Sequence, residues 1–188
     1  MNGKVIIFSA PSGSGKTTII KSLLEKDLNL QFSVSACSRP KRLEEIEGKD
    51  YYFIQAEEFK KRIKENQFIE WQEVYKNFFY GTPKSEIERL WKDKVNIVFD
   101  VDVLGGINLK KIFKNQALSL FIKPPSIDEL EVRLRKRHTE DQSTLLNRIE
   151  RSKKELTYSE QFDMIIINDY LEKAITEAYH AIKTFISK

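Results

Sequence analysis

The chain has 188 residues, of which 40% are hydrophobic and 32% charged, and its formal net charge is +4. This length and composition favour one folded domain and exclude a largely disordered chain. A single cysteine, Cys37, excludes an intrachain disulfide framework, and two histidines argue against a histidine metal cluster. The apolar run at residues 5–8 is too short for a signal peptide or a membrane span, so we expect a cytoplasmic protein.

The first predicted strand, residues 4–8, leads into a loop of small residues, and an amphipathic helix follows. The loop and the start of the helix consist of Ala10, Pro11, Ser12, Gly13, Ser14, Gly15, Lys16, Thr17 and Thr18. This is the pattern of a phosphate-binding loop (P-loop), whose glycines let backbone N–H groups turn toward an anion at a helix N-terminus. We expect it to bind ATP, because Lys16 can reach the β- and γ-phosphates and the Thr17 hydroxyl can bind Mg²⁺. Ala10 stands where the strict motif has glycine.

Residues 34–92 interrupt the alternation of strands and helices, which predicts a small lobe inserted into the core. Its expected elements are strands at residues 51–54 and 68–71 and a helix around residues 56–66. Arg39 and Arg42 lie three residues apart and Tyr51 follows them. Two arginines at this spacing can bind a phosphate bidentately, and a tyrosine hydroxyl can add a third hydrogen bond. The lobe therefore contains a candidate second anion site.

The rest of the chain returns to regular alternation. We expect strands at residues 95–99, 117–122 and 164–167 and a helix over residues 171–186. Ser126 and Glu129 form a capping box that opens another helix. Continuous apolar runs are typical of parallel strands buried on both faces, so the chain is predicted to be an α/β protein, a three-layer parallel sheet core with helices on both faces. Trp71 and Trp91 are expected in the core, and Cys37 is expected to be half-buried.

Residues 133–154 are rich in lysine and arginine, and their central part, residues 138–143, is polar and lacks apolar anchors. This composition is typical of a mobile flap over a phosphate site. A P-loop, a second anion site and a flap together are the parts of a small-molecule kinase. A Ras-type GTPase would contain Asn-Lys-x-Asp, which does not occur, and a larger motor ATPase would need a longer chain.

The sequence resembles the guanylate kinases, nucleoside monophosphate kinases that phosphorylate GMP. The residues that carry the resemblance are Ser38, Arg39, Arg42, Glu45, Gly48, Tyr51 and Phe53, then Glu70, Tyr80, Gly81, Thr82, Asp100 and Asp102. It extends over essentially the whole chain and implies a single domain, with a core at residues 1–33, 93–132 and 155–188, a GMP-binding lobe at residues 34–92 and a short lid at residues 133–154. The departures from the family pattern are Cys37, usually threonine, Glu44, often glycine, and His138, commonly glycine.

The resemblance implies roles for the residues that match the family's motifs. Ser35, Glu70, Thr82 and Asp102 would contact guanine, and Arg39, Arg42, Tyr51 and Tyr80 would hold the GMP phosphate. The implied GMP-binding set also contains Gly81, Asp100 and Arg148, and the implied ATP-binding set adds Arg133, Arg137 and Asn168 to the P-loop. The implied catalytic residues are Lys16, Arg39, Arg137 and Arg148.

Elementary chemistry agrees with these implied contacts. Guanine presents N1–H and a 2-amino group as donors and O6 as an acceptor, so carboxylates suit its donor edge and hydroxyls can serve O6. Asp100 and Asp102 end an apolar run two residues apart and face the same side, and Asp100 stands where a Walker-B aspartate would support Mg²⁺ together with the P-loop threonine. The alternative for this pair is two surface acids that cap a strand. Likewise, Asp169 could simply cap the last helix, and Arg135 and Arg151 could be solvated charges.

We therefore expect an enzyme that uses Mg²⁺ and transfers a phosphoryl group from ATP to GMP in purine metabolism. We expect no nucleic-acid or membrane partner, and a monomer rather than a homo-oligomer. Three alternatives are a guanylate-kinase-like binding module of scaffold proteins, a nucleic-acid binder, and a kinase for another small phosphate ester. The intact P-loop argues against the first and the lack of an aromatic and basic stripe against the second, while Glu70 and Asp102 favour guanine over the third.

Overall fold

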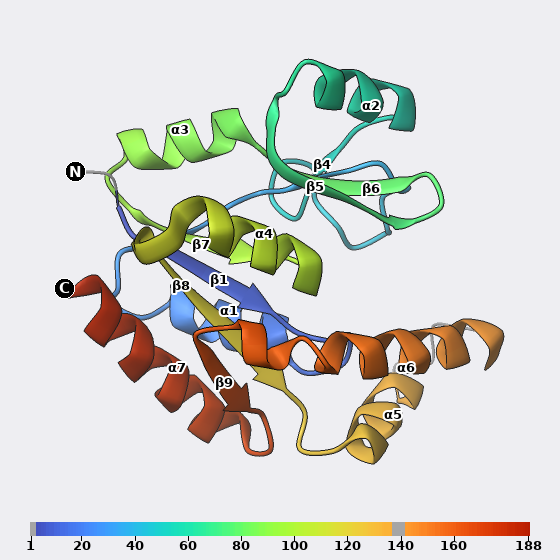
Figure 1. Cartoon of the computed structure of the whole chain (residues 1–188), viewed down its shortest axis with the longest axis vertical. Helices are drawn as coiled ribbons and strands as arrows, with labels where there is room; N and C mark the ends of the chain where they lie inside the picture. The colour runs from blue at the N-terminus through green and yellow to red at the C-terminus, as the bar shows by residue number, and fades with distance from the viewer. Residues whose placement is uncertain (1–2, 137–141) are drawn as a thin grey trace.

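A parallel sheet with strand order β2-β7-β1-β8-β9 forms the centre of the structure (Figure 1). The computed structural model describes residues 3–136 and 142–188. The strands of this sheet are β1 (Val5–Ser9), β2 (Leu30–Phe32), β7 (Asn96–Asp100), β8 (Ala117–Lys123) and β9 (Met164–Ile167). The P-loop follows β1 and Asp100 ends β7, the neighbouring strand, so both lie at the carboxyl ends of the parallel strands, where open α/β sheets bind ligands.

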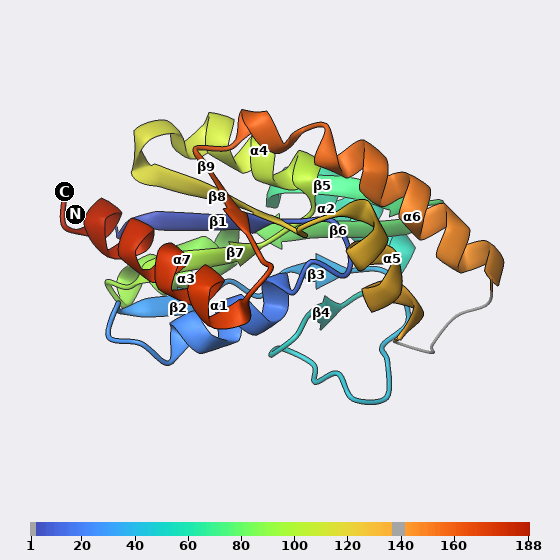
Figure 2. The same ribbon diagram turned by 90° about the horizontal axis from the view of Figure 1, so that it is seen from below.

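Helices cover both faces of this sheet (Figure 2). They are α1 (Lys16–Leu24), α3 (Lys84–Lys92), α4 (Val103–Phe113) and α7 (Leu171–Ile186). Ile6 and Phe8 of β1 pack against α1 and α7, whereas Val5 and Ile7 pack against α3 and α4 on the other face. All four side chains are fully buried, because successive residues of a strand point to opposite faces. Each such burial contributes about 1.5–3 kcal/mol, which explains why β1 is a continuous apolar run.

A second sheet with strand order β4-β3-β6-β5 lies beside the carboxyl ends of the strands of the first sheet. Its elements are β3 (Ala36–Cys37), β4 (Tyr52–Phe53), β5 (Phe68–Tyr75) and β6 (Phe78–Pro83), with α2 (Ala56–Lys64) packed on one face. Phe59 of α2 stacks on Phe68 with ring centroids 4.3 Å apart, and Phe79 joins them in a small separate core. The opposite face of this sheet is turned toward the first sheet.

Two more helices, α5 (Ile127–Arg135) and α6 (Gln142–Leu156), lie at the carboxyl ends of the strands of the first sheet. They pack against each other through Leu130, Leu134 and Ile149. Short 3₁₀ turns, Lys114–Gln116 and Ser159–Gln161, precede β8 and β9. Among the described residues, we find no helix with the length and apolar character that crossing a bilayer requires.

The structure confirms the predicted α/β fold and most of its elements. The four predicted strands of the core sheet and the helix at Leu171–Ile186 lie within one residue of the expected bounds, whereas β2 was not predicted. The Ser126 hydroxyl accepts a 3.0 Å hydrogen bond from the Glu129 backbone at the start of α5. Trp71 is 42% exposed rather than in the core, and Cys37 is fully buried rather than half-buried. Asp169 does not cap α7, whose N-cap is Tyr170.

Candidate active site

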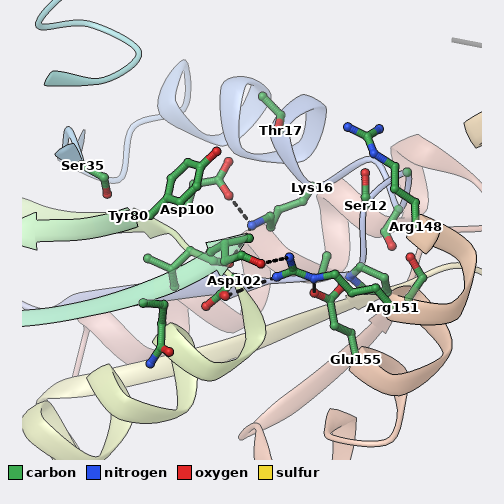
Figure 3. Close-up of a pocket in the computed structure, with 18 of the residues that line it drawn as sticks. Ser12, Lys16, Thr17, Ser35, Tyr80, Asp100, Asp102, Arg148, Arg151 and Glu155 are labelled. Carbon is green, nitrogen blue, oxygen red and sulfur yellow. Dashed lines mark hydrogen bonds and ion pairs between the residues drawn. The ribbon is translucent and has the colours of Figure 1, made fainter. Parts of the chain in front are cut away.

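A cavity of about 830 Å³ lies between the P-loop, the second sheet and α6 (Figure 3). The predicted site residues that line it are Ala10, Pro11, Ser12, Gly13, Ser14, Gly15, Lys16, Thr17, Thr18, Ser35, Arg42, Tyr51, Glu70, Tyr80, Gly81, Asp100, Asp102 and Arg148. Residues from distant parts of the sequence thus meet in one cleft. Arg137, predicted for both ATP binding and catalysis, lies outside the described residues, as do residues 138–141 of the predicted flap.

The P-loop takes its shape from two glycines and from the residues behind it. Gly13 has φ +90° and Gly15, the N-cap of α1, has φ +84°, a region that favours glycine. A Cβ on Gly15 would lie 2.3 Å from Nδ2 of Asn168, and this amide donates a 2.7 Å hydrogen bond to the Ser14 carbonyl. Asn168, predicted to bind ATP, therefore supports the loop from behind.

A smaller hollow of about 300 Å³ lies on the outer side of the loop. Its lining includes Gly13, Thr18, Arg133 and Asn168. The Arg133 guanidinium donates to the Asn168 carbonyl at 3.1 Å and to Glu129 at 2.8 Å, so the first of these contacts joins α5 to the end of β9. Arg133 and Asn168, both predicted to bind ATP, thus lie here rather than in the large cavity.

Lys16 turns toward the end of β7. Its ammonium pairs with the Asp100 carboxylate and donates a 2.8 Å hydrogen bond to the Val101 carbonyl, as Figure 3 shows for the aspartate. The P-loop cation and the predicted Mg²⁺ ligand therefore neutralise each other in this structure. An anion that enters the loop competes with Asp100 for Lys16.

Glu45 connects two of the predicted phosphate-binding residues, Arg39 and Arg42, in the segment between β3 and β4. Arg39 binds Glu45 through both terminal nitrogens, with Nη1 at 2.7 Å, and its Nε donates to the Tyr80 hydroxyl at 3.1 Å. Glu45 also accepts from the Arg42 backbone at 2.8 Å. Burial raises the pKa of the Tyr51 hydroxyl, which stays a neutral donor. Arg39 does not line the cavity, so its contact with the cleft runs through Tyr80.

A register shift turns Glu70 toward the cleft. β5 has one residue more than β6 between the pairs Phe68↔Pro83 and Glu70↔Thr82, so Phe68 faces α2 while Glu70 lines the cavity. Glu70 is 8% exposed and accepts a 2.9 Å hydrogen bond from the Thr82 hydroxyl. Burial raises its pKa to about 7, and the nearby Asp102 carboxylate acts in the same direction.

Asp102 lies beside Glu70 and starts α4. Its Oδ1 accepts a 2.7 Å hydrogen bond from the Gly105 backbone as the N-cap of that helix. A Cβ on Gly105 would lie 3.0 Å from Oδ1 of Asp102 and 3.1 Å from Oε2 of Glu70. The two carboxylates thus converge on one small volume that a larger residue would obstruct. Two converging acceptors suit a ligand edge that carries adjacent donors.

Helix α6 contributes one face to the cleft, formed by Arg148, Arg151, Ser152 and Glu155. Their spacing of three, four and seven residues places them on one side of a helix. The alternative that Arg151 is a solvated charge is wrong, because its side chain is 30% exposed and contacts Glu155, Val74 and Asp102. For Arg135 the same alternative is confirmed: its side chain is 51% exposed and pairs with Glu131 of the same helix. Sequence reasoning missed Glu155, although its spacing from Arg148 indicated a shared face.

Comparisons with known proteins agree with this geometry. A family model described as guanylate kinase matches residues 2–187. A guanylate kinase of Bacteroides thetaiotaomicron is 50% identical over 188 residues, which cover 100% of this chain and 92% of that protein. One of Porphyromonas gingivalis is 48% identical over 98% of this chain and 99% of its own. The crystal structure of guanylate kinase from Anaplasma phagocytophilum superposes with a TM-score of 0.81 at 29% identity, over 100% of this chain and 88% of that one. With a P-loop and two converging carboxylates in one cleft, the chain belongs to the guanylate kinase family.

Proposed function

We propose that the large cavity is the place where this kinase transfers a phosphoryl group from ATP to GMP, which yields ADP and GDP. The observation that carries the proposal is that one cavity is lined both by the P-loop and by the carboxylate pair Glu70 and Asp102. The P-loop provides a site for the phosphates of ATP, and the carboxylates provide acceptors for the two donors on the guanine edge. GMP-binding residues then come from the segment 34–92, together with Asp100, Asp102 and Arg148.

The reaction needs alignment and charge compensation more than acid–base chemistry. The attacking atom is a phosphate oxygen of GMP that already carries negative charge, so no general base is required. Two anionic groups must approach, and their repulsion is reduced by Lys16 from the P-loop, by Arg148 from α6 and by the Arg39 and Arg42 cluster. On ATP binding, Lys16 would leave Asp100 for the phosphates, while Tyr51 and Tyr80 would donate to the GMP phosphate.

Thr17 and Asp100 fit the Mg²⁺ ion that usually accompanies ATP. A hydroxyl and a carboxylate are hard oxygen donors of the kind that Mg²⁺ prefers, and both residues line the cavity. Exchange of Lys16 from Asp100 to the phosphates would free the carboxylate to help hold the ion. When bound with ATP, Mg²⁺ supplies charge neutralisation at the β- and γ-phosphates.

An assay of ADP release with GMP, AMP, CMP and UMP as acceptors tests this function. We expect turnover with GMP and little with the others, because only guanine presents the donor edge that two carboxylates can bind. Lys16→Ala should lower kcat by on the order of 10²- to 10⁴-fold with an unchanged circular dichroism spectrum, since one preorganised cation is lost. Lys21→Ala, on the exposed side of the same helix, is the matched control.

Equal rates for all four acceptors would contradict the assignment of the carboxylate pair to guanine. A folded Lys16→Ala variant with the rate of the control would contradict the assignment of the P-loop. A guanylate-kinase-like binding module would release no ADP with any of the four acceptors, so the same assay separates that alternative. A cytoplasmic location and a monomeric state stay predictions.

A further inference from the structure

Arg151 joins three elements around the cleft. It belongs to α6, its Nη1 donates to the Val74 carbonyl of β5 at 3.2 Å, and its Nη2 lies 3.5 Å from Oδ2 of Asp102 between β7 and α4. Figure 3 shows its guanidinium between Asp102 and Glu155. A solvated surface charge would not make these contacts.

The guanidinium is held in place by contacts within the protein. Its Nε donates to Glu155 at 2.7 Å, one turn further along α6, and its central carbon lies 5.2 Å from the centre of the Tyr75 ring. Together with the Val74 carbonyl, these contacts fix the plane of the group from three sides. A planar guanidinium with fixed donors can orient a carboxylate, whereas a lysine ammonium in the same place could hold fewer of these partners at once.

Asp102 needs such orientation, because its two oxygens have different tasks. Oδ1 is occupied by the Gly105 backbone at 2.7 Å, so only Oδ2 is directed toward Arg151. The separation of 3.5 Å is longer than a tight hydrogen bond, which leaves lone pairs of Oδ2 available for another donor. Arg151 thus holds the Asp102 carboxylate in a fixed orientation without saturating it.

We propose that Arg151 is a positioning residue for guanine recognition, which holds the Asp102 carboxylate ready beside Glu70 and thereby links α6 to the GMP site. This inference rests on the proposed function, because it takes Asp102 as a guanine contact. Arg151 acts through Asp102 and not on the transferred phosphoryl group. Its loss therefore raises the KM for GMP and changes the KM for ATP and kcat little.

Steady-state kinetics of Arg151→Gln and Lys153→Gln, with calorimetric titration of GMP, provide the first test. Lys153 is the matched control, since it lies on the same helix, also loses one positive charge, and pairs with Glu150 at the surface. We expect the KM and Kd for GMP to rise about tenfold in Arg151→Gln, the loss expected for one contact to a charged group, and to stay within twofold in the control. A KM for ATP that rises as much as the KM for GMP would overturn the proposal.

A double-mutant cycle with Asp102→Asn decides whether Arg151 acts through Asp102. Asparagine retains the cap on α4 but removes the charge that Arg151 orients. If the proposal is right, Arg151→Gln weakens GMP binding less than twofold in the Asp102→Asn background, because the two effects are not additive. Additive losses would overturn it.

Two further observations keep the test decisive. If Arg151→Gln does not fold, as judged by its thermal melt, Arg151→Lys takes its place: we expect an intermediate loss of GMP affinity, and wild-type affinity would overturn the proposal. The wild-type enzyme measured alongside separates the two claims. Without ADP release on addition of GMP the proposed function itself fails, whereas wild-type turnover with an unaffected Arg151→Gln variant rejects only the role of Arg151.

Discussion

Replacement of Glu70 by glutamine tests base recognition with the smallest change of shape. The side chain is 8% exposed and one of its oxygens accepts the Thr82 hydroxyl at 2.9 Å. Glutamine can keep that hydrogen bond through its oxygen, but its NH₂ group then faces the donor edge of guanine. A mismatched buried polar contact costs about 1–3 kcal/mol, which corresponds to a roughly ten- to hundredfold loss of kcat/KM for GMP. The KM for ATP should stay nearly unchanged.

The pH dependence of GMP binding gives a second signature of Glu70. Its pKa of about 7 means that the carboxyl of the free protein becomes protonated as the pH falls below neutrality, and only the ionised form accepts two donors. GMP affinity should therefore rise with pH through this range in the wild type. The GMP phosphate also titrates near pH 6, but it does so equally in both proteins. The difference between wild type and Glu70→Gln in calorimetric titrations from pH 5.5 to 8.5 thus reports Glu70 alone.

The same carboxyl should affect stability with the opposite sign. Because its pKa is raised on folding from 4.5 to about 7, its contribution is fully favourable below pH 4.5 and is lost as the pH rises through 7. The loss is on the order of 3 kcal/mol, so Glu70→Gln should raise the Tm at pH 8 but not at pH 5.

A Glu70→Gln variant that weakens ATP and GMP binding equally, or whose GMP affinity keeps the wild-type pH dependence, would refute the role of Glu70 as a base contact.

Other parts of the site lead to three more expectations. Gly15→Ala should abolish ATP binding and lower the Tm, because its Cβ would lie 2.3 Å from the Asn168 amide at a φ of +84°; retained ATP binding in a titration would contradict this account of the loop. Glu45→Gln should raise the KM for GMP about tenfold, since Arg39 loses its charged partner, whereas Glu44→Gln at the exposed neighbouring position should not. Small-angle scattering should show a smaller radius of gyration with GMP and a non-hydrolysable ATP analogue, since cations on separate elements must converge on adjacent phosphates; an unchanged radius would indicate a rigid site.

The predictable parts of the fold are those in which one local pattern outweighs everything else. The strand Val5–Ser9 was predictable because a strand buried on both faces is a continuous apolar run. The helix Leu171–Ile186 was predictable because burial of one helix face repeats apolar residues every three or four positions. The strand Leu30–Phe32 was not, because it is three residues long and pairs only with β7 at the edge of its sheet. The helix Lys84–Lys92 was not predictable either. It starts directly after Pro83, the last residue of a strand, and no side chain caps its N-terminus with a hydrogen bond.

The site residues divide along the same line. The P-loop is local in sequence, so its pattern predicted the position of Lys16 between a strand and a helix. The direction of Glu70 depends on a single extra residue in β5 relative to its partner strand, and pairing of this kind is invisible in one sequence. Arg151 was ambiguous for a similar reason, because its partners Val74 and Asp102 are far away in the chain.

The pairing of charged side chains in the site cannot be deduced from a pattern in the linear sequence. Lys16 pairs with Asp100 and Arg39 pairs with Glu45, so two cations that we propose to act on phosphates are paired with carboxylates. These pairs keep the cations oriented and partly shielded from water, which avoids the cost of a buried, unpaired charge. Since a dianionic phosphate offers more charge and more acceptor oxygens than one carboxylate, it can displace or share such a partner. We therefore expect that only a ligand with enough negative charge can take these cations from their carboxylates, which would favour phosphorylated nucleotides over neutral nucleosides.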